Sequence, residues 1–179
     1  MKNLKYAITG HTRGVGKAVY DKIDPENIMG FSTSTGYDIN KREDRDRIVQ
    51  EAFECDVFIN NAADNFGQVY MFLDMLKVWR ALPDKKIINI GSRTAEITLP
   101  LSHYHLLYVH AEKIALKAVS NQLAPNTKCK VDYRWFPAVG TEAMLAKYPY
   151  WTHEDYITPE RAAEIILSDS PLFYTLKLS

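Results

Sequence analysis

Tyr108 and Lys113 combine a phenol with an ammonium group inside "LLYVHAEKIALKAV", a segment with helical periodicity. A free phenol has a pKa of about 10, too high for easy proton exchange at neutral pH, and a nearby ammonium favours its ionised form. Such a pair could act as an acid and its electrostatic helper. Residues four apart on a helix differ by roughly 40° around the axis, whereas residues five apart differ by roughly 140°. The spacing of five therefore puts the two groups on different sides of a regular helix.

A glycine-rich segment, "TGHTRGVG", carries the second chemical signal through Gly10, Gly14 and Gly16. An apolar run precedes it and a stretch of helical period follows. Glycines in this setting allow a tight turn and let backbone amides at a helix N-terminus approach a pyrophosphate closely. The pattern predicts a cradle for nucleotide phosphates, with an ordinary strand-to-helix turn as the alternative.

These residues need a scaffold, and the chain alternates short apolar runs with longer stretches of helical period. The alternation predicts an α/β fold with a doubly wound, mostly parallel sheet in a single domain over 1–179. We expect strands at 5–10, 27–33, 37–39, 56–61, 86–91, 130–136 and 173–178. We expect helices at 13–23, 41–53, 67–82, 107–122 and 158–167, the last with Thr158 as its N-cap. The connections 33–37 and 61–67 are too short to hold a crossover helix, so we expect no such helix in either of them.

Composition restricts the class of protein. Of 179 residues, 46% are apolar and 25% charged, which is typical of soluble globular proteins. Basic and acidic residues balance at 22 each, and no stretch approaches a membrane span, so we expect neither a nucleic-acid nor a membrane partner. Cys55 and Cys129 form no CxxC pattern, so we expect no disulfide framework and no metal site. A cytoplasmic protein fits these features.

The spacing TGxxxGxG resembles the short-chain dehydrogenase/reductase family, and later segments resemble it in the same order. "DVFINNAA" looks like the family's NNAG segment with Ala63 in place of glycine, and "IINIGSRTA" is similar to the strand that delivers the catalytic serine. "AEKIALKAVSNQLA" resembles the helix of the catalytic lysine, and "VDYRWFPAVGT" resembles the strand before the Pro-Gly turn. The resemblance covers about residues 5–141, and "TPERAAEII" resembles a late helix of the family. It implies hydride transfer between a nicotinamide cofactor and a small carbonyl or alcohol.

The resemblance also implies a set of cofactor-binding residues. Asp38 would bind the adenine amino group, although Asp is also common in turns. The residues implied around the phosphates and the riboses are Gly10, Thr12, Arg13, Gly14, Val15, Gly16, Asn61, Ala62, Ala63, Lys113, Pro137, Val139 and Thr141.

The end of the second expected strand favours NADP(H) over NAD(H). An NAD site usually presents a carboxylate there, whereas "GFSTSTG" offers Ser32, Thr33 and Ser34 as hydrogen-bond donors to a 2′-phosphate. Arg13 could add a charge-assisted contact; the alternative is a solvated surface arginine.

For catalysis, the resemblance makes Tyr108 the acid and Lys113 its partner and ribose ligand. Ser92 would bind the substrate oxygen and Asn65 would retain a water molecule, with a structural serine and a helix cap as their alternatives.

The tyrosine spacing leaves three interpretations. Aligning the apolar stripe with the family puts Val109 at the tyrosine position, and shifting the register by one puts Glu112 at the lysine position. Tyr108 could lie in an irregular first turn or beside a one-residue bulge and still reach the substrate. Tyr104 or His105 could act from the preceding loop. Alternatively the acid is lost, and the chain is a non-catalytic NADP(H)-binding sensor or interaction protein.

Residues 141–157 correspond to a substrate lid in the family and carry the aromatic residues Tyr148, Tyr150, Trp151 and Tyr156. Core packing or a subunit contact are alternatives for these side chains. The resemblance is also compatible with a homodimer or homotetramer formed through the long helices, with Trp79 on that face.

Overall fold

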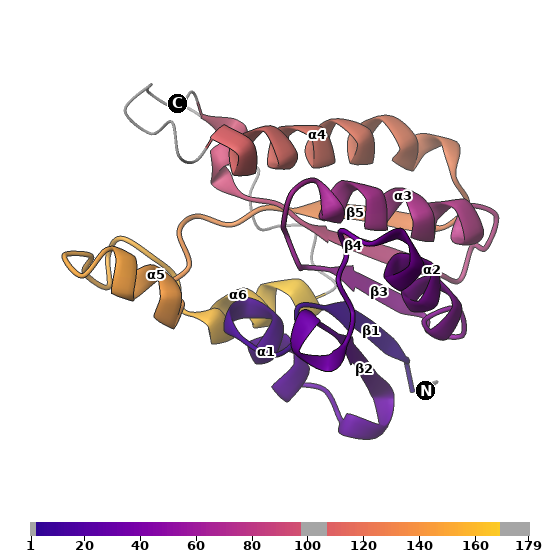
Figure 1. The fold of residues 1–179 in the computed structure, drawn as a ribbon, viewed down its shortest axis with the longest axis horizontal. Helices are drawn as coiled ribbons and strands as arrows, with labels where there is room; N and C mark the ends of the chain where they lie inside the picture. Colours follow the sequence, from indigo (N-terminus) through magenta and orange to yellow (C-terminus); the bar gives the residue numbers. More distant parts are fainter. Residues whose placement is uncertain (1–2, 98–106, 169–179) are drawn as a thin grey trace.

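A five-stranded parallel sheet forms the centre of the protein (Figure 1). The computed structural model describes residues 3–97 and 107–168. The strand order is β2-β1-β3-β4-β5, and every pairing is parallel. The strands are β1 (Tyr6–Thr9), β2 (Ile28–Phe31), β3 (Val57–Asn60), β4 (Lys86–Ile90) and β5 (Lys130–Arg134).

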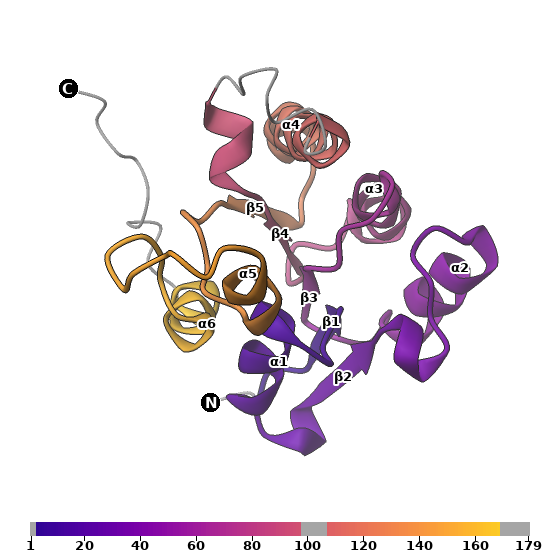
Figure 2. The same ribbon diagram turned by 60° about the vertical axis from the view of Figure 1, so that its left-hand side comes forward.

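Helices cover both faces of this sheet, so the predicted doubly wound α/β architecture is confirmed. Figure 2 shows α2, α3 and α4 on one face and α1 and α6 on the other. The helices are α1 (Gly14–Asp21), α2 (Arg42–Glu51), α3 (Gly67–Trp79), α4 (Leu107–Leu123), α5 (Glu142–Lys147) and α6 (Pro159–Leu167). Short 3-10 turns are η1 (Pro25–Asn27), η2 (Thr33–Thr35), η3 (Arg93–Glu96) and η5 (Ala124–Asn126).

The core consists of two apolar layers separated by the sheet. Phe58, Phe72 and Leu116 belong to the layer under α2, α3 and α4. Ile8 and Ile166 belong to the layer under α1 and α6. A strand covered on both faces must be apolar throughout, which explains why β3 is buried at every position.

The caps explain where several helices begin. Thr158 is the N-cap of α6, as predicted, and its side chain accepts a hydrogen bond from the backbone N–H of Arg161. The next residue is Pro159, whose missing N–H costs nothing in the first turn.

Three predictions about single elements differ from the structure, and a fourth lies outside the described residues. Residues 37–39 form no strand, because Asp38 turns the chain directly into α2. The strand expected at 173–178 lies outside the described residues. Trp79 is 0% exposed, so it forms part of the core instead of an exposed helix face. The helical spacing of apolar residues such as Ile114 predicts that their side of α4 is buried, but Ile114 is exposed and the buried side carries Glu112 and Lys113.

No helix in the described ranges is both long enough and apolar enough to cross a membrane.

Candidate functional site

The strand order reverses at β1, and a pocket opens at this point. From β1 the chain first moves outward to β2 and later returns to the other side as β3. Ligands of open α/β sheets bind at the carboxyl ends of strands where the order reverses. The pocket has a volume of about 610 Å³ and is lined by Gly10, Thr12, Arg13, Phe31, Ser32, Thr33, Ser34, Tyr37, Asp38, Ile39, Asn40, Asn61, Ala62, Ala63 and Asp64. Most of the expected adenosine and phosphate residues therefore line one pocket.

The floor of the pocket is the glycine-rich turn between β1 and α1. Gly10 and Gly14 have φ angles of 73° and 56°, which favour glycine. A Cβ atom on Gly16 would lie 2.0 Å from the carbonyl oxygen of Gly10, so only glycine allows this approach. Val15 is half-buried and packs on the α1–α6 layer of the core. The turn thus has a conformation that requires glycine at these positions.

Thr9 holds the floor to the neighbouring strand, and the sequence analysis missed it. Its hydroxyl oxygen accepts hydrogen bonds from the backbone N–H groups of Asn61 and Ala62, both at 3.0 Å. The Asn61 side chain donates to the carbonyl oxygen of Thr9 at 3.0 Å. A polar residue at the end of an otherwise apolar strand was the signal that could have revealed this role.

A row of hydroxyl groups connects the end of β2 with the glycine turn. Ser32 Oγ and Ser34 Oγ are 2.8 Å apart, and Ser34 Oγ donates to Thr12 Oγ1 at 3.3 Å. Thr33 and Arg13 are exposed beside them at the pocket. This rim has donors and one guanidinium, which is the chemistry that an anionic group requires.

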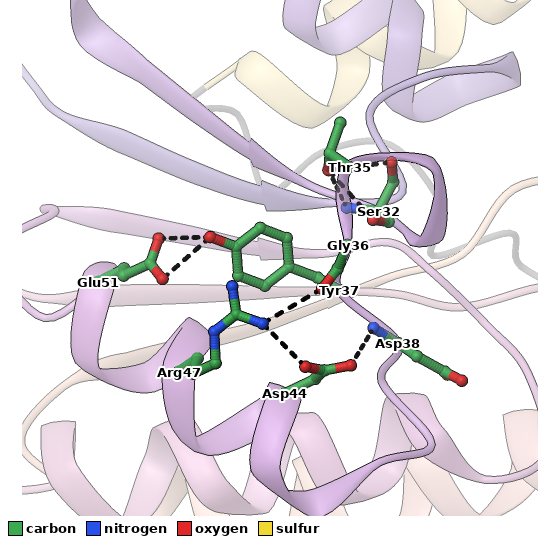
Figure 3. Close-up of polar contacts among 8 residues, drawn as sticks. All are labelled: Ser32, Thr35, Gly36, Tyr37, Asp38, Asp44, Arg47 and Glu51. Atoms are coloured by element: carbon green, nitrogen blue, oxygen red, sulfur yellow. Dashed lines mark hydrogen bonds and ion pairs between the residues drawn. The ribbon is translucent and has the colours of Figure 1, made fainter.

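The opposite wall of the pocket is fixed by contacts with α2 (Figure 3). The backbone N–H of Asp38 donates to Asp44 Oδ2 at 3.0 Å, and Arg47 pairs with Asp44 Oδ1 at 3.0 Å. The Arg47 guanidinium lies 4.4 Å from the centre of the Tyr37 ring. The Tyr37 hydroxyl donates to the Glu51 carboxylate, which raises the pKa of Tyr37. These contacts hold Asp38 at the edge of the pocket.

Ser92 follows β4 at the same edge of the sheet. It is half-buried and caps η3: its Oγ accepts from Thr94 N at 3.2 Å and from Thr94 Oγ1 at 3.0 Å. Both bonds use Ser92 Oγ as acceptor, so its own O–H remains a donor. The structural alternative and the catalytic one are therefore compatible.

Tyr108 and Lys113 do not meet on α4. Tyr108 is 74% exposed, whereas Lys113 is 7% exposed. Lys113 Nζ donates to Gln68 Oε1 at 2.5 Å and to the carbonyl oxygen of Ile90 at 3.0 Å. Burial lowers the pKa of Lys113 to about 8, and the neighbouring Glu112 carboxylate opposes that effect. Tyr104 and His105, the other candidate acids, lie outside the described residues.

Comparison with solved structures decides the fold type. A protein described as a short-chain dehydrogenase/reductase family protein superimposes with a TM-score of 0.73, at 18% identity, over 93% of this chain and 90% of its own. The protein has the short-chain dehydrogenase/reductase fold. No family model and no curated protein sequence matches the chain.

Two other structures with this fold contain nicotinamide cofactors. A short-chain dehydrogenase of Burkholderia cenocepacia J2315 in complex with NADP has a TM-score of 0.73 at 20% identity, over 93% of this chain and 83% of its own. The 3-alpha-hydroxysteroid dehydrogenase of Pseudomonas sp. B-0831, complexed with NADH, has a TM-score of 0.67 at 16% identity, over 90% and 87%.

Within the short-chain dehydrogenase/reductase fold, Asn65 lies just before α3 and outside the helix. It is exposed, and Asn65 and Phe66 have φ angles of 46° and 66°. Phe66 is the N-cap position and forms no side-chain cap. Asn65 is therefore not the cap of α3.

Residues 141–157, which we expect to form a lid, are held by backbone hydrogen bonds where the segment begins and where it ends. Gly140 N donates to Ile157 O at 2.9 Å, and Ile157 N donates to Ala138 O at 3.0 Å. Val139 pairs with Ile157, and Pro137 is half-buried. Thr141 caps α5, and its methyl group would be 3.2 Å from a Cβ atom on Gly14. The start of this segment thus lies against the glycine turn.

The rest of that segment carries an aromatic stack. The rings of Tyr148 and Trp151 are stacked 4.8 Å apart, and those of Trp151 and Tyr156 are 6.3 Å apart. Tyr150 is 74% exposed and meets Tyr148 edge to face.

Side chains that commonly bind metal ions do not cluster in the part of the chain that the structure describes. No group of three or more His, Cys, Asp or Glu side chains there could hold an ion.

Proposed function

We propose that the protein binds NADP(H) in the pocket at the ends of β1, β2 and β3 and acts as an oxidoreductase on a small carbonyl or alcohol. The observation that carries this proposal is the close approach at Gly16, where a Cβ atom would lie 2.0 Å from the carbonyl oxygen of Gly10. Such an approach has little use in an ordinary turn, but it exposes the amides of a helix N-terminus to phosphate.

The residues of the pocket fit each part of this cofactor. The pyrophosphate would bind amides of the glycine turn after Gly10, whose own N–H donates to the Phe31 carbonyl oxygen. Asp38 would accept a hydrogen bond from the adenine amino group. The hydroxyl row of Thr12, Ser32 and Ser34, together with Arg13, would hold the 2′-phosphate. Structures with the same fold hold NADP and NADH, which supports a nicotinamide cofactor. The proposed preference for NADP(H) rests on the hydroxyl row and Arg13 of this chain.

The chemistry would take place beyond the pocket, near the end of β4. The cofactor supplies or accepts the hydride. Ser92 would donate a hydrogen bond to the substrate oxygen, because both observed bonds leave its O–H free to do so. Tyr108 is the proposed proton donor, with Lys113 and Asn65 in supporting roles. Its 74% exposure requires the start of α4 to turn toward the substrate.

A second candidate function is NADP(H) binding without turnover, as in a redox sensor or interaction protein. The observation that favours it is the engagement of Lys113, whose ammonium is bound by Gln68 and Ile90 instead of lying beside Tyr108. A nearby cation favours the ionised form of a phenol, and here the ammonium is bound elsewhere.

The test combines binding and turnover on the same sample. NADPH and NADH are titrated by fluorescence, and a panel of small carbonyl compounds is then followed at the nicotinamide absorbance. We expect tighter binding of NADPH than of NADH, followed by oxidation of NADPH with at least one compound. Binding without turnover across a broad panel would favour the second function, and no binding of either nucleotide would contradict both.

A further inference from the structure

Gln68 is a buried polar residue at the meeting point of α3, α4 and the sheet. It is the second residue of α3 and is 0% exposed. The ends of β3 and β4 both contact its side chain, and two successive residues of α4 contact it from the other side. A glutamine in this position must satisfy its amide within the protein.

The side-chain amide of Gln68 has three partners. Nε2 donates to the carbonyl oxygen of Asn60 at 2.7 Å and to that of Ile90 at 3.0 Å. Oε1 accepts from Lys113 Nζ at 2.5 Å. Only one orientation of the amide satisfies all three, because carbonyl groups only accept and an ammonium only donates. The amide orientation is therefore dictated by its surroundings.

The backbone of Gln68 extends the same network. Its N–H donates to Glu112 Oε1 at 3.2 Å, and its carbonyl oxygen accepts from Asn60 Nδ2 at 2.9 Å. One residue of α3 thus binds a carboxylate and an ammonium from adjacent positions of α4. The Glu112 carboxylate also lies at the N-terminus of α3, where the helix dipole favours a negative charge.

We propose that Gln68 is a positioning residue, whose amide holds the Lys113 ammonium against the Ile90 carbonyl at the end of β4, two residues before Ser92. Ser92 is the proposed donor to the substrate oxygen, so the functional part of the inference rests on the proposed function. The effect of Gln68 on the charge of Lys113 does not depend on that function.

The charged groups around Lys113 are few in the described ranges. On α4, Glu112 is its charged neighbour and favours the ammonium, while burial disfavours it. Burial raises the pKa of Glu112, against the effect of Lys113 and of the Gln68 N–H, and Asp64 before α3 also raises it. From the sheet, the uncharged carbonyl of Ile90 accepts from Lys113 Nζ, whereas that of Asn60 accepts from the Gln68 amide. The Gln68 oxygen is therefore a major partner of the charged form.

Two substitutions of Gln68 should move the titration of Lys113 in opposite directions. Gln68→Leu removes an acceptor from a buried ammonium and should lower its titration midpoint by about one pH unit. Gln68→Glu places a carboxylate beside the ammonium and should raise the midpoint. The titration is followed by NMR of lysine side chains, with the Lys113 signal identified by its absence in Lys113→Met.

Ser120→Ala is the matched control. Ser120 also lies on the buried side of α4, where its Oγ accepts from Asn89 Nδ2 at 2.9 Å and donates to the carbonyl oxygen of Leu116 at 2.6 Å. The substitution removes the buried hydrogen bonds of the Ser120 hydroxyl and leaves Lys113 and its partners unchanged. We expect a lower stability and an unchanged Lys113 midpoint.

The inference is overturned if the Lys113 midpoint in Gln68→Glu equals that of the wild type, or if Ser120→Ala moves it as far as Gln68→Leu does. If Gln68→Leu fails to fold, Gln68→Glu still decides, since the raised midpoint is expected of that variant alone. The titration needs no cofactor. A wild type that binds neither NADPH nor NADH would thus contradict the proposed function while leaving the result on Gln68 intact.

Discussion

Tyr108 and Lys113 lie on the same helix in opposite environments, since Tyr108 is 74% exposed and Lys113 is 7% exposed. The difference follows from their spacing of five, which separates two side chains by roughly 140° around a helix. Lys113 faces the sheet, where Gln68 and Ile90 bind its ammonium. The sequence alternative of an irregular first turn therefore requires the start of α4 to differ from this structure when a substrate is bound.

Tyr108→Phe tests that requirement directly. As the proposed acid, Tyr108 should contribute about 10²–10⁴ to the rate, so loss of its hydroxyl should lower kcat by about a hundredfold or more. NADPH affinity should stay the same. A change in kcat of less than about threefold would contradict the assignment of Tyr108 as the acid and show that the start of α4 does not turn toward the substrate.

Arg13→Gln should separate NADPH from NADH. Removal of the guanidinium at the hydroxyl rim should weaken NADPH binding by about 10- to 150-fold, because a charge-assisted bond to phosphate contributes about 1.5–3 kcal/mol. NADH, which lacks the 2′-phosphate, should bind as before. Lys17→Gln on α1 is the control, since Lys17 is exposed and already paired with Asp21. Equal weakening for both nucleotides would place Arg13 away from the 2′-phosphate.

Asp44→Ala should weaken the two nucleotides equally. Without Asp44 the backbone N–H of Asp38 loses its acceptor, and the adenine side of the pocket loses its fixed position. We expect a two- to tenfold weakening, or about 0.5–1.5 kcal/mol, for NADPH and NADH alike. The control is Asp46→Ala on the same helix, because Asp46 pairs only loosely with Arg42 at 3.8 Å. Selective weakening of NADPH would contradict this role.

Gly16→Ala should abolish nucleotide binding and lower stability. The new Cβ atom would lie 2.0 Å from the Gly10 carbonyl oxygen, so the glycine turn must open. Gly36→Ala is a suitable comparison, because a Cβ atom on Gly36 would meet no other atom, although its φ angle of 87° is unfavourable for alanine. This variant should lower the free energy of unfolding by about 1 kcal/mol, while nucleotide binding persists. Fluorescence titration and urea unfolding of both variants give the answer. Binding by Gly16→Ala with wild-type affinity would remove the main support for the cradle.

Stability should rise with pH through Lys113. Its pKa is lowered from 10.5 to about 8 in the folded protein, chiefly by burial. Between these values the unfolded chain binds more protons, so the free energy of unfolding should increase by up to about 1.4 kcal/mol per pH unit. Below pH 8 both states are protonated, so Lys113 no longer makes stability change with pH, and the full cost of the buried ammonium is present.

Urea unfolding between pH 7 and 9.5 measures this slope. Lys113→Met should lose the rise, and Lys117→Met, which removes an exposed partner of Glu96, should keep it. The range stops at pH 9.5 because burial raises the pKa of Tyr133 to about 12, which lowers stability in more alkaline solution. Identical slopes in the wild type and Lys113→Met would show that Lys113 is not a buried cation.

Much of this protein can be derived from local sequence. The apolar runs at β1, β3 and β4 predict buried parallel strands because both faces of these strands are covered. Gly10, Gly14 and Gly16 predict the phosphate cradle because their conformations and close contacts tolerate no side chain. Each of these signals depends only on a residue and its near neighbours along the chain.

Only the tertiary structure decided which side of α4 is buried and which groups meet there. The apolar residues of α4, such as Ile114, predict one buried side, yet Glu112 and Lys113 are buried instead because Gln68 and the end of β4 form hydrogen bonds with them. The partners of Thr9 and Gln68 were likewise not predictable, because Ala62 lies 53 positions from Thr9, and Glu112 and Lys113 lie 44 and 45 positions from Gln68. A buried polar group is stable only with such partners, and pairing between distant segments is settled by the folded chain as a whole.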